Sequence, residues 1–376
     1  MNILFCGDIM PGGILAYQEK YISEDVLAFM HSFDLRIGTL EAAIGTNLPY
    51  DETKMNGRRN IIYARNEDFY RVVDMGFNVV SLANNHVFDL GEEGLKNTIR
   101  LLEENGIQYC GAGMNLEEAS KPAVVHIDGE SIAILSCCMY GNKYLGYVEL
   151  AGENKSGINP LDMSRLISDI KKAKEKYDFV FVMPHWGIEY QYFPMVECKA
   201  MACKMIDAGA DMVIGGHPHN IQPRIKYHSK YIYFSLGNFI FPDYYMEPPR
   251  PIWYPDREFD LSNIKSVIGY PPRIEEPTKS VWMGRARIGM VVQVLMEGKK
   301  MQSKYKLLYL SKDNILRFYV CVNKCFKRMR LLTMGWAIKS TCFGVIYRIY
   351  NSKLNLPRRA FHVVSRVLRI NYDVKV

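Results

Sequence analysis

The first 240 residues of the chain alternate short apolar runs with longer amphipathic segments, and this alternation constrains the fold most. Short apolar runs bounded by turn residues predict buried strands, whereas charges recurring along one side of a longer segment predict surface helices. Strands are expected at residues 2–6, 34–40, 78–83, 123–127, 131–137, 179–183, 211–214, 224–227 and 231–235, and helices at 23–32, 67–75, 92–104, 162–177 and 195–208. Hairpins join some of these strands and helices join others, so the sequence predicts an α/β fold with helices covering a mixed sheet.

Residues 242–285 interrupt this alternation. Eight of the 17 prolines lie between Pro242 and Pro277, together with aromatic residues such as Trp253 and Phe259. Proline fixes φ and cannot donate to a strand ladder, so the segment is predicted to be a long loop, either a structured lid or disordered. Apolar runs at 288–296 and 304–310 then predict a strand pair that closes a domain of residues 1–310.

The charge of the chain is divided unevenly. Residues 311–376 carry 14 Lys and Arg against 2 Asp and Glu, whereas residues 1–310 carry 33 against 38. On a helical wheel the basic residues of this tail oppose apolar ones, which predicts two basic amphipathic helices. One starts near Ile315, with Phe318 and Val322 on its apolar side, and the second follows Pro357, with Arg358, Arg359, Arg366 and Arg369 on its basic side. Their apolar faces are expected either to dock on the domain or to bind a membrane surface or a partner protein. Nucleic acid is the least favoured partner because no nucleic-acid motif accompanies the charge.

Cysteine usage and the N-terminal sequence predict a cytoplasmic protein. The nine cysteines are odd in number, several lie in apolar runs, and none forms a CxxC pair, so we expect free thiols in a reducing compartment. Met1 is followed directly by the first predicted strand, without a basic leader. No uncharged apolar stretch reaches 18 residues, since Lys339 interrupts the nearest one at 331–347. The basic tail then suggests peripheral attachment to the inner face of the plasma membrane.

Residue types that bind metals recur where the predicted strands end. Because sites in such sheets gather at the carboxyl ends of strands, these side chains are expected to converge. Oxygen and nitrogen donors together suit Mn, Fe, Zn or Mg, and a bridging carboxylate would hold two ions close together. Each piece alone has an ordinary alternative: a Gly-Asp turn, a helix cap at Asp89, or a packed histidine. The strand-end residues are Asp8, Glu41, Asn85 with His86, His185, and His217 with His219.

In this order the motifs resemble those of the CapA family of capsule and poly-γ-glutamate biosynthesis proteins. The matching segments are Gly7-Asp8-Ile-Met10, Leu40-Glu41, Leu82-Ala-Asn84-Asn85-His86-Val-Phe-Asp89, His185-Trp-Gly-Ile-Glu189-Tyr190, Gly215-Gly216-His217-Pro-His219 and Ser235-Leu-Gly237-Asn238-Phe239. The resemblance covers residues 1–241, with the strand pair near 286–310. This family is similar to the calcineurin-like metallophosphoesterases, so the resemblance implies a two-sheet αββα sandwich.

The resemblance also implies roles for individual residues. Asp8 and His219 would bind one ion, and Glu41 would bridge it to a second ion held by the residues Asn85, His185 and His217. His86 would donate a proton to the leaving oxygen, and Asp89 would orient it. Arg58 and Arg59, in residues 56–60, are candidates for binding the substrate, with a solvated charge pair as the alternative.

One departure bears on the first metal site. The metallophosphoesterases usually carry a histidine where this chain has Met10, and a thioether is a poor ligand for hard ions. Two functions therefore stay open. The first is metal-assisted hydrolysis of a phosphoester or anionic polymer with one or two ions per chain. The second is non-catalytic binding or export of a polyanion, as a subunit of a membrane-associated synthase complex that the tail would contact.

Overall fold

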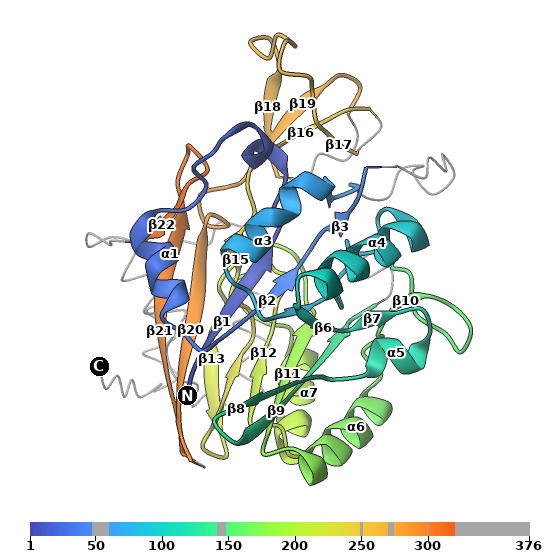
Figure 1. Ribbon diagram of the computed structural model, residues 1–376, viewed down its shortest axis with the longest axis vertical. Helices are drawn as coiled ribbons and strands as arrows, with labels where there is room; N and C mark the ends of the chain where they lie inside the picture. The colour runs from blue at the N-terminus through green and yellow to red at the C-terminus, as the bar shows by residue number, and fades with distance from the viewer. Residues whose placement is uncertain (47–59, 141–147, 249–250, 270–273, 299, 320–376) are drawn as a thin grey trace, which may run out of the picture.

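Two β-sheets form the centre of the fold. The computed structural model describes residues 1–46, 60–140, 148–248, 251–269, 274–298 and 300–319. The first sheet has the order β22-β21-β20-β1-β2-β5-β6, with β15 also pairing with β1, and the second has the order β13-β14-β12-β11-β9-β8 (Figure 1). The strands of the first sheet are β1 (Asn2–Ile9), β2 (Leu35–Leu40), β5 (Val79–Ser81), β6 (Gln108–Cys110), β15 (Asn238–Ile240), β20 (Ile288–Glu297), β21 (Lys300–Leu310) and β22 (Leu316–Phe318). Those of the second are β8 (Ala123–Ile127), β9 (Glu130–Cys138), β11 (Phe179–His185), β12 (Met212–Ile214), β13 (Arg224–Tyr227) and β14 (Lys230–Tyr233).

Both sheets contain a run of parallel strands. In the first sheet β1, β2, β5 and β6 are parallel, and in the second β9, β11, β12 and β14 are parallel. Antiparallel hairpins add β20 and β21 to one sheet and β8 and β13 to the other. Parallel strands bring their carboxyl ends to one edge, which is the edge where polar side chains follow the strands.

Apolar residues on alternate positions of the strands form the core between the sheets. Ile3 and Phe5 of β1 pack in one cluster with residues of β11, and the ring centroids of Phe5 and Phe181 are 5.2 Å apart. The intervening Leu4 and Cys6 belong to a different cluster that includes helix residues. This period of two is the one expected of a strand buried on both faces.

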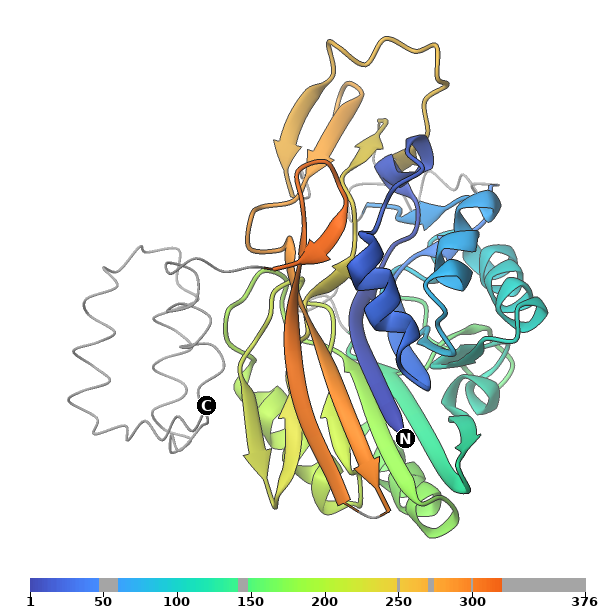
Figure 2. The same cartoon turned by 60° about the vertical axis from the view of Figure 1, so that its left-hand side comes forward.

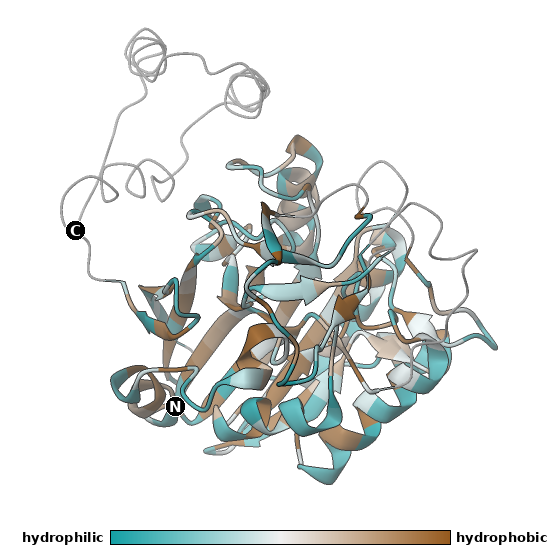
Figure 3. Ribbon diagram, turned by 90° about the horizontal axis from the view of Figure 1, so that it is seen from above, coloured by the Kyte–Doolittle hydropathy of each residue, from teal (hydrophilic) through white to brown (hydrophobic). Residues whose placement is uncertain are grey.

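Helices cover the outer faces of the sheets (Figure 2). Leu166 and Ile170 of α6, together with residues of α7, pack on the outer face of the second sheet. Apolar residues of α1, α3 and α4 pack on the outer face of the first sheet. The expected two-sheet sandwich flanked by helices is therefore confirmed, and Figure 3 shows apolar strands inside and hydrophilic outer helix surfaces. The helices are α1 (Glu24–His31), α3 (Tyr70–Asp74), α4 (Gly91–Glu104), α5 (Leu116–Ser120), α6 (Met163–Lys176) and α7 (Val196–Asp207), with the 3-10 helices η1 (Gly13–Tyr17) and η2 (Asn66–Phe69).

Local signals account for the helix ends. Asp162 caps α6 by accepting hydrogen bonds from the backbone N–H groups of Ser164 (2.8 Å) and Arg165 (3.2 Å). Such a cap contributes about 1 kcal/mol. Gly209 follows α7 with a φ of +121°, a conformation that glycine adopts without strain.

The proline-rich segment is not the long loop that its composition predicts. It contains a four-stranded sheet that projects from one end of the sandwich (Figure 1), made of β16 (Tyr244–Met246), β17 (Ile252–Trp253), β18 (Lys265–Ile268) and β19 (Thr278–Val281). Short pairs β3 (Ala43–Ile44) with β4 (Tyr63–Ala64) and β7 (Ala112–Gly113) with β10 (Gly157–Ile158) complete the strands described. The described prolines of the segment lie outside these four strands, so they remove few donors from the ladders; they are Pro242, Pro248, Pro251, Pro255 and Pro277.

The beginning of the basic tail also differs from its prediction. The expected helix starting near Ile315 is wrong at this point, because β22 pairs antiparallel with β21 from Leu308↔Phe318 to Leu310↔Leu316. Leu316 is buried, and the Phe318 ring lies 5.3 Å from that of Phe29, so tertiary contacts outweigh the helical pattern. The predicted helices beyond residue 319 lie outside the described residues. No helix in the described ranges combines the length and apolar character needed to cross a membrane.

Candidate metal centre

Polar side chains from both sheets meet at the carboxyl ends of the parallel strands. Asp8 lies inside β1 rather than after it, at a register shift in the pairing with β15. Glu41 directly follows β2, and His185 is the last residue of β11. The register shift at Asp8 changes the direction in which a strand side chain points. The structure thus brings together six of the sequence-predicted ligands, all buried: Asp8, Glu41, Asn85, His185, His217 and His219.

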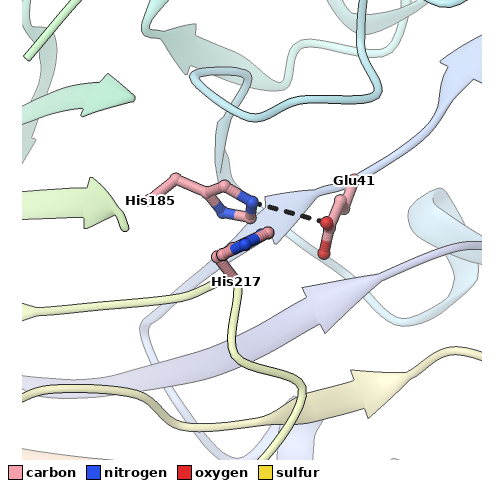
Figure 4. Close-up of side chains that lie close together, drawn as sticks. All are labelled: Glu41, His185 and His217. Carbon is pink, nitrogen blue, oxygen red and sulfur yellow. Dashed lines mark ion pairs between the residues drawn. The ribbon is translucent and has the colours of Figure 1, made fainter. Parts of the chain in front are cut away.

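Two overlapping triads of ligand atoms form at this edge. One is Glu41, His185 and His217, and the other is Asp8, Glu41 and His219; within each, the ligand atoms lie within 4.8 Å of one another. Figure 4 shows Glu41, His185 and His217 pointing toward one another, with Nε2 of His185 3.4 Å from Oε1 of Glu41. Glu41 belongs to both triads.

The loop after β12 presents its histidines through an unusual backbone. His217 has a φ of +95° and His219 a φ of +51°, values that non-glycine residues adopt only where the surroundings enforce them. Gly216 precedes them, and a Cβ at this position would lie 2.7 Å from Oδ1 of Asp8. The backbone N–H of His217 donates to Oδ2 of Asp8 (3.3 Å). The glycine therefore permits the close approach that joins this loop to β1.

Two asparagines hold the candidate ligands in place. Oδ1 of Asn85 lies 2.8 Å from Nε2 of His185, and Oδ1 of Asn238 lies 2.8 Å from Nδ1 of His219. Asn238 also donates to the carbonyl of Ala286 (3.0 Å). Hydrogen bonds of this kind fix the ring orientation of a ligand histidine. Sequence reasoning did not assign Asn238 to the site, although its position after Gly237 in the Ser-Leu-Gly-Asn-Phe motif was the available signal.

His86 and Asp89 form a buried pair next to the triads. Nδ1 of His86 lies 2.6 Å from Oδ2 of Asp89, and the same carboxylate oxygen accepts from the backbone N–H of Ile62 (2.8 Å). The alternative that Asp89 caps a helix is excluded, because the N-cap of α4 is Leu90 and no side chain caps it. A carboxylate partner of this kind fixes the tautomer and the orientation of the imidazole ring.

Burial sets the protonation of the centre. Desolvation lowers the pKa of His185 to about 4 and that of His219 to about 3, and it places the pKa of His217 well below its usual value. Burial, and then the negative charge of Glu41, raise the pKa of Asp8. Neutral imidazole is the form that binds metals. A bound cation would stabilise the ionised forms of the neighbouring carboxyl groups of Asp8 and Glu41.

Several of these polar atoms lack a hydrogen-bond partner among the residues that the structure describes. They are both ring nitrogens of His217, Nδ1 of His185 and Oδ1 of Asp8. Burying polar atoms without partners is costly unless a ligand satisfies them. The donor set of imidazole nitrogens and carboxylate oxygens therefore fits the predicted divalent ion, Mn, Fe, Zn or Mg.

The remaining predicted residues lie elsewhere. Met10 is fully buried in an apolar cluster with Phe241 and Tyr244, and its sulfur accepts from the backbone N–H of Gly12 (3.2 Å). Residues 56–59, with Arg58 and Arg59, are outside the described part of the chain. Sequence reasoning also missed Trp282, whose ring centroid lies 4.9 Å from that of His219.

The fold and the site together define an α/β two-sheet sandwich with a buried candidate metal centre at its strand ends. The chain belongs to the family described as bacterial capsule synthesis protein PGA_cap, whose model matches residues 2–243. The resemblance to the CapA family is thereby confirmed. The matched region stops before β20 and β21, although β20 pairs with β1 in the middle of the first sheet.

Named relatives agree with this membership. The chain is 31% identical over 251 residues to the capsule biosynthesis protein CapA of Bacillus anthracis, covering 64% of this chain and 60% of that protein. It is 33% identical to the PGA biosynthesis protein CapA of Bacillus subtilis (strain 168), covering 64% of this chain and 63% of that protein. The chain thus spans less than two thirds of the length of these relatives. A solved structure, the calcineurin-like phosphoesterase YfkN from Bacillus subtilis, is 13% identical with a TM-score of 0.41, covering 93% of this chain and 98% of that one.

Proposed function

We propose that this chain is a metal-dependent hydrolase that acts on a phosphoester or an anionic polymer during capsule or poly-γ-glutamate biosynthesis. The observation that carries the proposal is the pair of buried triads that share Glu41. Relatives named for capsule and PGA biosynthesis support the biological setting.

In this proposal Asp8, Glu41 and His219 would hold one divalent ion, and Glu41, Asn85, His185 and His217 would hold a second. Bound ions would supply electrostatic stabilisation of the charge that develops on the reacting group. His86 donates a proton to the leaving oxygen. Asp89 keeps the other ring nitrogen occupied, so that the proton to be transferred resides on Nε2.

The basic residues 311–376 support a proposal about location. We place the protein in the cytoplasm, attached peripherally to the inner face of the plasma membrane or to a synthase subunit through this tail. Arg58 and Arg59 remain candidates for contacting an anionic substrate.

The test combines metal content with turnover. Purified protein loaded with Mn, Zn, Fe or Mg is assayed for bound metal and for hydrolysis of a phosphodiester and a phosphomonoester. His217→Ala is expected to lose at least one ion per chain and to reduce hydrolysis at least 100-fold, because both its ring nitrogens are buried at the triad. His126→Ala, which changes an exposed histidine of β8, is the matched control.

The second candidate function is polyanion binding without catalysis. The observation in its favour is Met10, which packs in an apolar cluster where metallophosphoesterases usually carry a histidine. Two ions per chain with hydrolysis support the enzyme. One ion or none, with no hydrolysis by any of the four metals, would transfer the proposal to the binding function.

A further inference from the structure

One turn of the chain lies against the metal centre and carries an arginine. The ring of Trp282 lies 4.9 Å from that of His219, and the carbonyl of Ala286 accepts from Asn238, which in turn contacts His219. These two contacts fix both ends of the turn against a candidate ligand. Arg285 lies between them.

The guanidinium of Arg285 is held in place by a tyrosine, with no ion pair among the described residues. It lies over the Tyr192 ring, 4.9 Å from the centroid, and Nη1 donates to the Tyr192 hydroxyl (2.9 Å). Within the described residues Arg285 forms no ion pair with a carboxylate, and its buried Nε has no hydrogen-bond partner. The side chain is half-buried, so a ligand can reach it. An arginine stacked on an aromatic ring offers a planar fork of donors that matches a carboxylate or phosphate.

Tyr190 lies between the turn and the centre. Its ring lies 6.0 Å from that of His219 and 6.2 Å from that of Trp282. Tyr190 therefore packs against both a candidate ligand and the turn that carries Arg285.

We infer that Arg285, positioned by Tyr192, binds a second oxyanion of the substrate while the reacting group occupies the metal centre. This inference rests on the proposed function and specifies its substrate class. The substrate is a polyanion with a carboxylate or phosphate beyond the reacting group, and an ester without that group loses the contact.

Direct binding tests this independently of turnover. The full-length, metal-loaded protein is titrated into two fluorescein-labelled probes, a γ-linked glutamate pentamer and tripolyphosphate, and Kd is measured by fluorescence anisotropy. Arg285→Met is expected to raise Kd about tenfold for at least one probe, because hydrogen bonds to charged groups are among the stronger ones. An effect on the pentamer alone assigns a carboxylate, and an effect on tripolyphosphate alone assigns a phosphate. Arg285→Lys is expected to restore part of the affinity, since it keeps the charge but not the fork.

A matched control is available in the same chain. Arg224 also stacks on a tyrosine, Tyr231, and donates to a tyrosine hydroxyl, that of Tyr233 (2.9 Å). Arg224→Met is expected to leave both Kd values unchanged. Metal content and Tm are measured for every variant, and Tyr192→Leu serves as a second variant that removes the stacking ring.

The outcomes separate this inference from the proposed function. Unchanged Kd for both probes in Arg285→Met, or no binding of either probe by the native protein, would overturn the inference. Arg285-dependent binding without hydrolysis of any ester would contradict the hydrolase proposal and leave the binding contact standing.

Discussion

Glu41 is common to both ligand triads, so a change of this one side chain would affect both of them. Burial keeps the imidazoles around it neutral, and His86 lies outside both triads with its Nδ1 hydrogen-bonded to Asp89 (2.6 Å). A histidine whose second nitrogen is held by a carboxylate is suited to proton transfer, whereas the imidazoles of the triads are suited to metal binding.

His86→Ala therefore separates the two roles. We expect the variant to keep its full metal content, because His86 is in neither triad, and to lose about 10²- to 10⁴-fold in kcat, the usual contribution of a general acid. Metal analysis and steady-state kinetics on a phosphodiester measure the two effects. Loss of metal in this variant would show that His86 is a ligand and would contradict the assigned role.

At the scale of elements, buried polar links join segments that are far apart in the chain. Asp243, just before β16, forms a buried ion pair with Arg287, just before β20, and accepts from Asn314 (3.2 Å) in the turn between β21 and β22. Arg287 also donates to the carbonyl of Ser311 (2.9 Å). This network attaches the base of the projecting sheet to the C-terminal strands of the main one.

Arg287→Met removes one partner of that network. Because it leaves the Asp243 carboxylate buried without its cation, we expect a loss of about 3–5 kcal/mol in the free energy of unfolding, measured with urea. Arg317→Met is the control, since its ion pair with Asp313 is exposed and contributes about 0–1 kcal/mol. Equal losses in the two variants would mean that the buried pair is not what stabilises this junction.

At the scale of the whole molecule, an acidic body is followed by a basic tail, 33 Lys and Arg against 38 Asp and Glu in residues 1–310 and 14 against 2 afterwards. The folded domain extends beyond residue 310, because β22 is part of the first sheet. A tail variant should therefore leave residues 1–319 intact, since a cut at residue 311 would remove a strand.

Replacing Arg358, Arg359, Arg366 and Arg369 by Gln in the full chain tests membrane attachment. Each basic residue near an anionic surface contributes about 1 kcal/mol, so removing four is expected to weaken binding to anionic vesicles at least 100-fold at low salt. Co-sedimentation with anionic vesicles measures this, and neutral vesicles provide the control. Binding that is equally strong before and after the replacement would refute attachment through this charge.

The sequence by itself determined the local elements and the candidate ligands. A helix is set by its cap and its apolar stripe, as at Asp162 and α6, and a strand by a run of apolar residues; both signals lie within a few neighbouring positions. Polar residues directly after such runs, as Glu41 is after β2, could be predicted to lie at one edge because parallel strands end together.

Only the tertiary structure decided which distant segments meet. The membership of Glu41 in both triads, the contact of Asn238 with His219 and the position of Arg285 depend on how the two sheets and the turn after β19 pack together. The same holds for β22, where pairing with β21 overrode a helical pattern, and for the strands within the proline-rich segment. The physical reason is that propensity and periodicity act over a few residues, whereas pairing and burial join residues tens to hundreds of positions apart and contribute the larger share of the free energy.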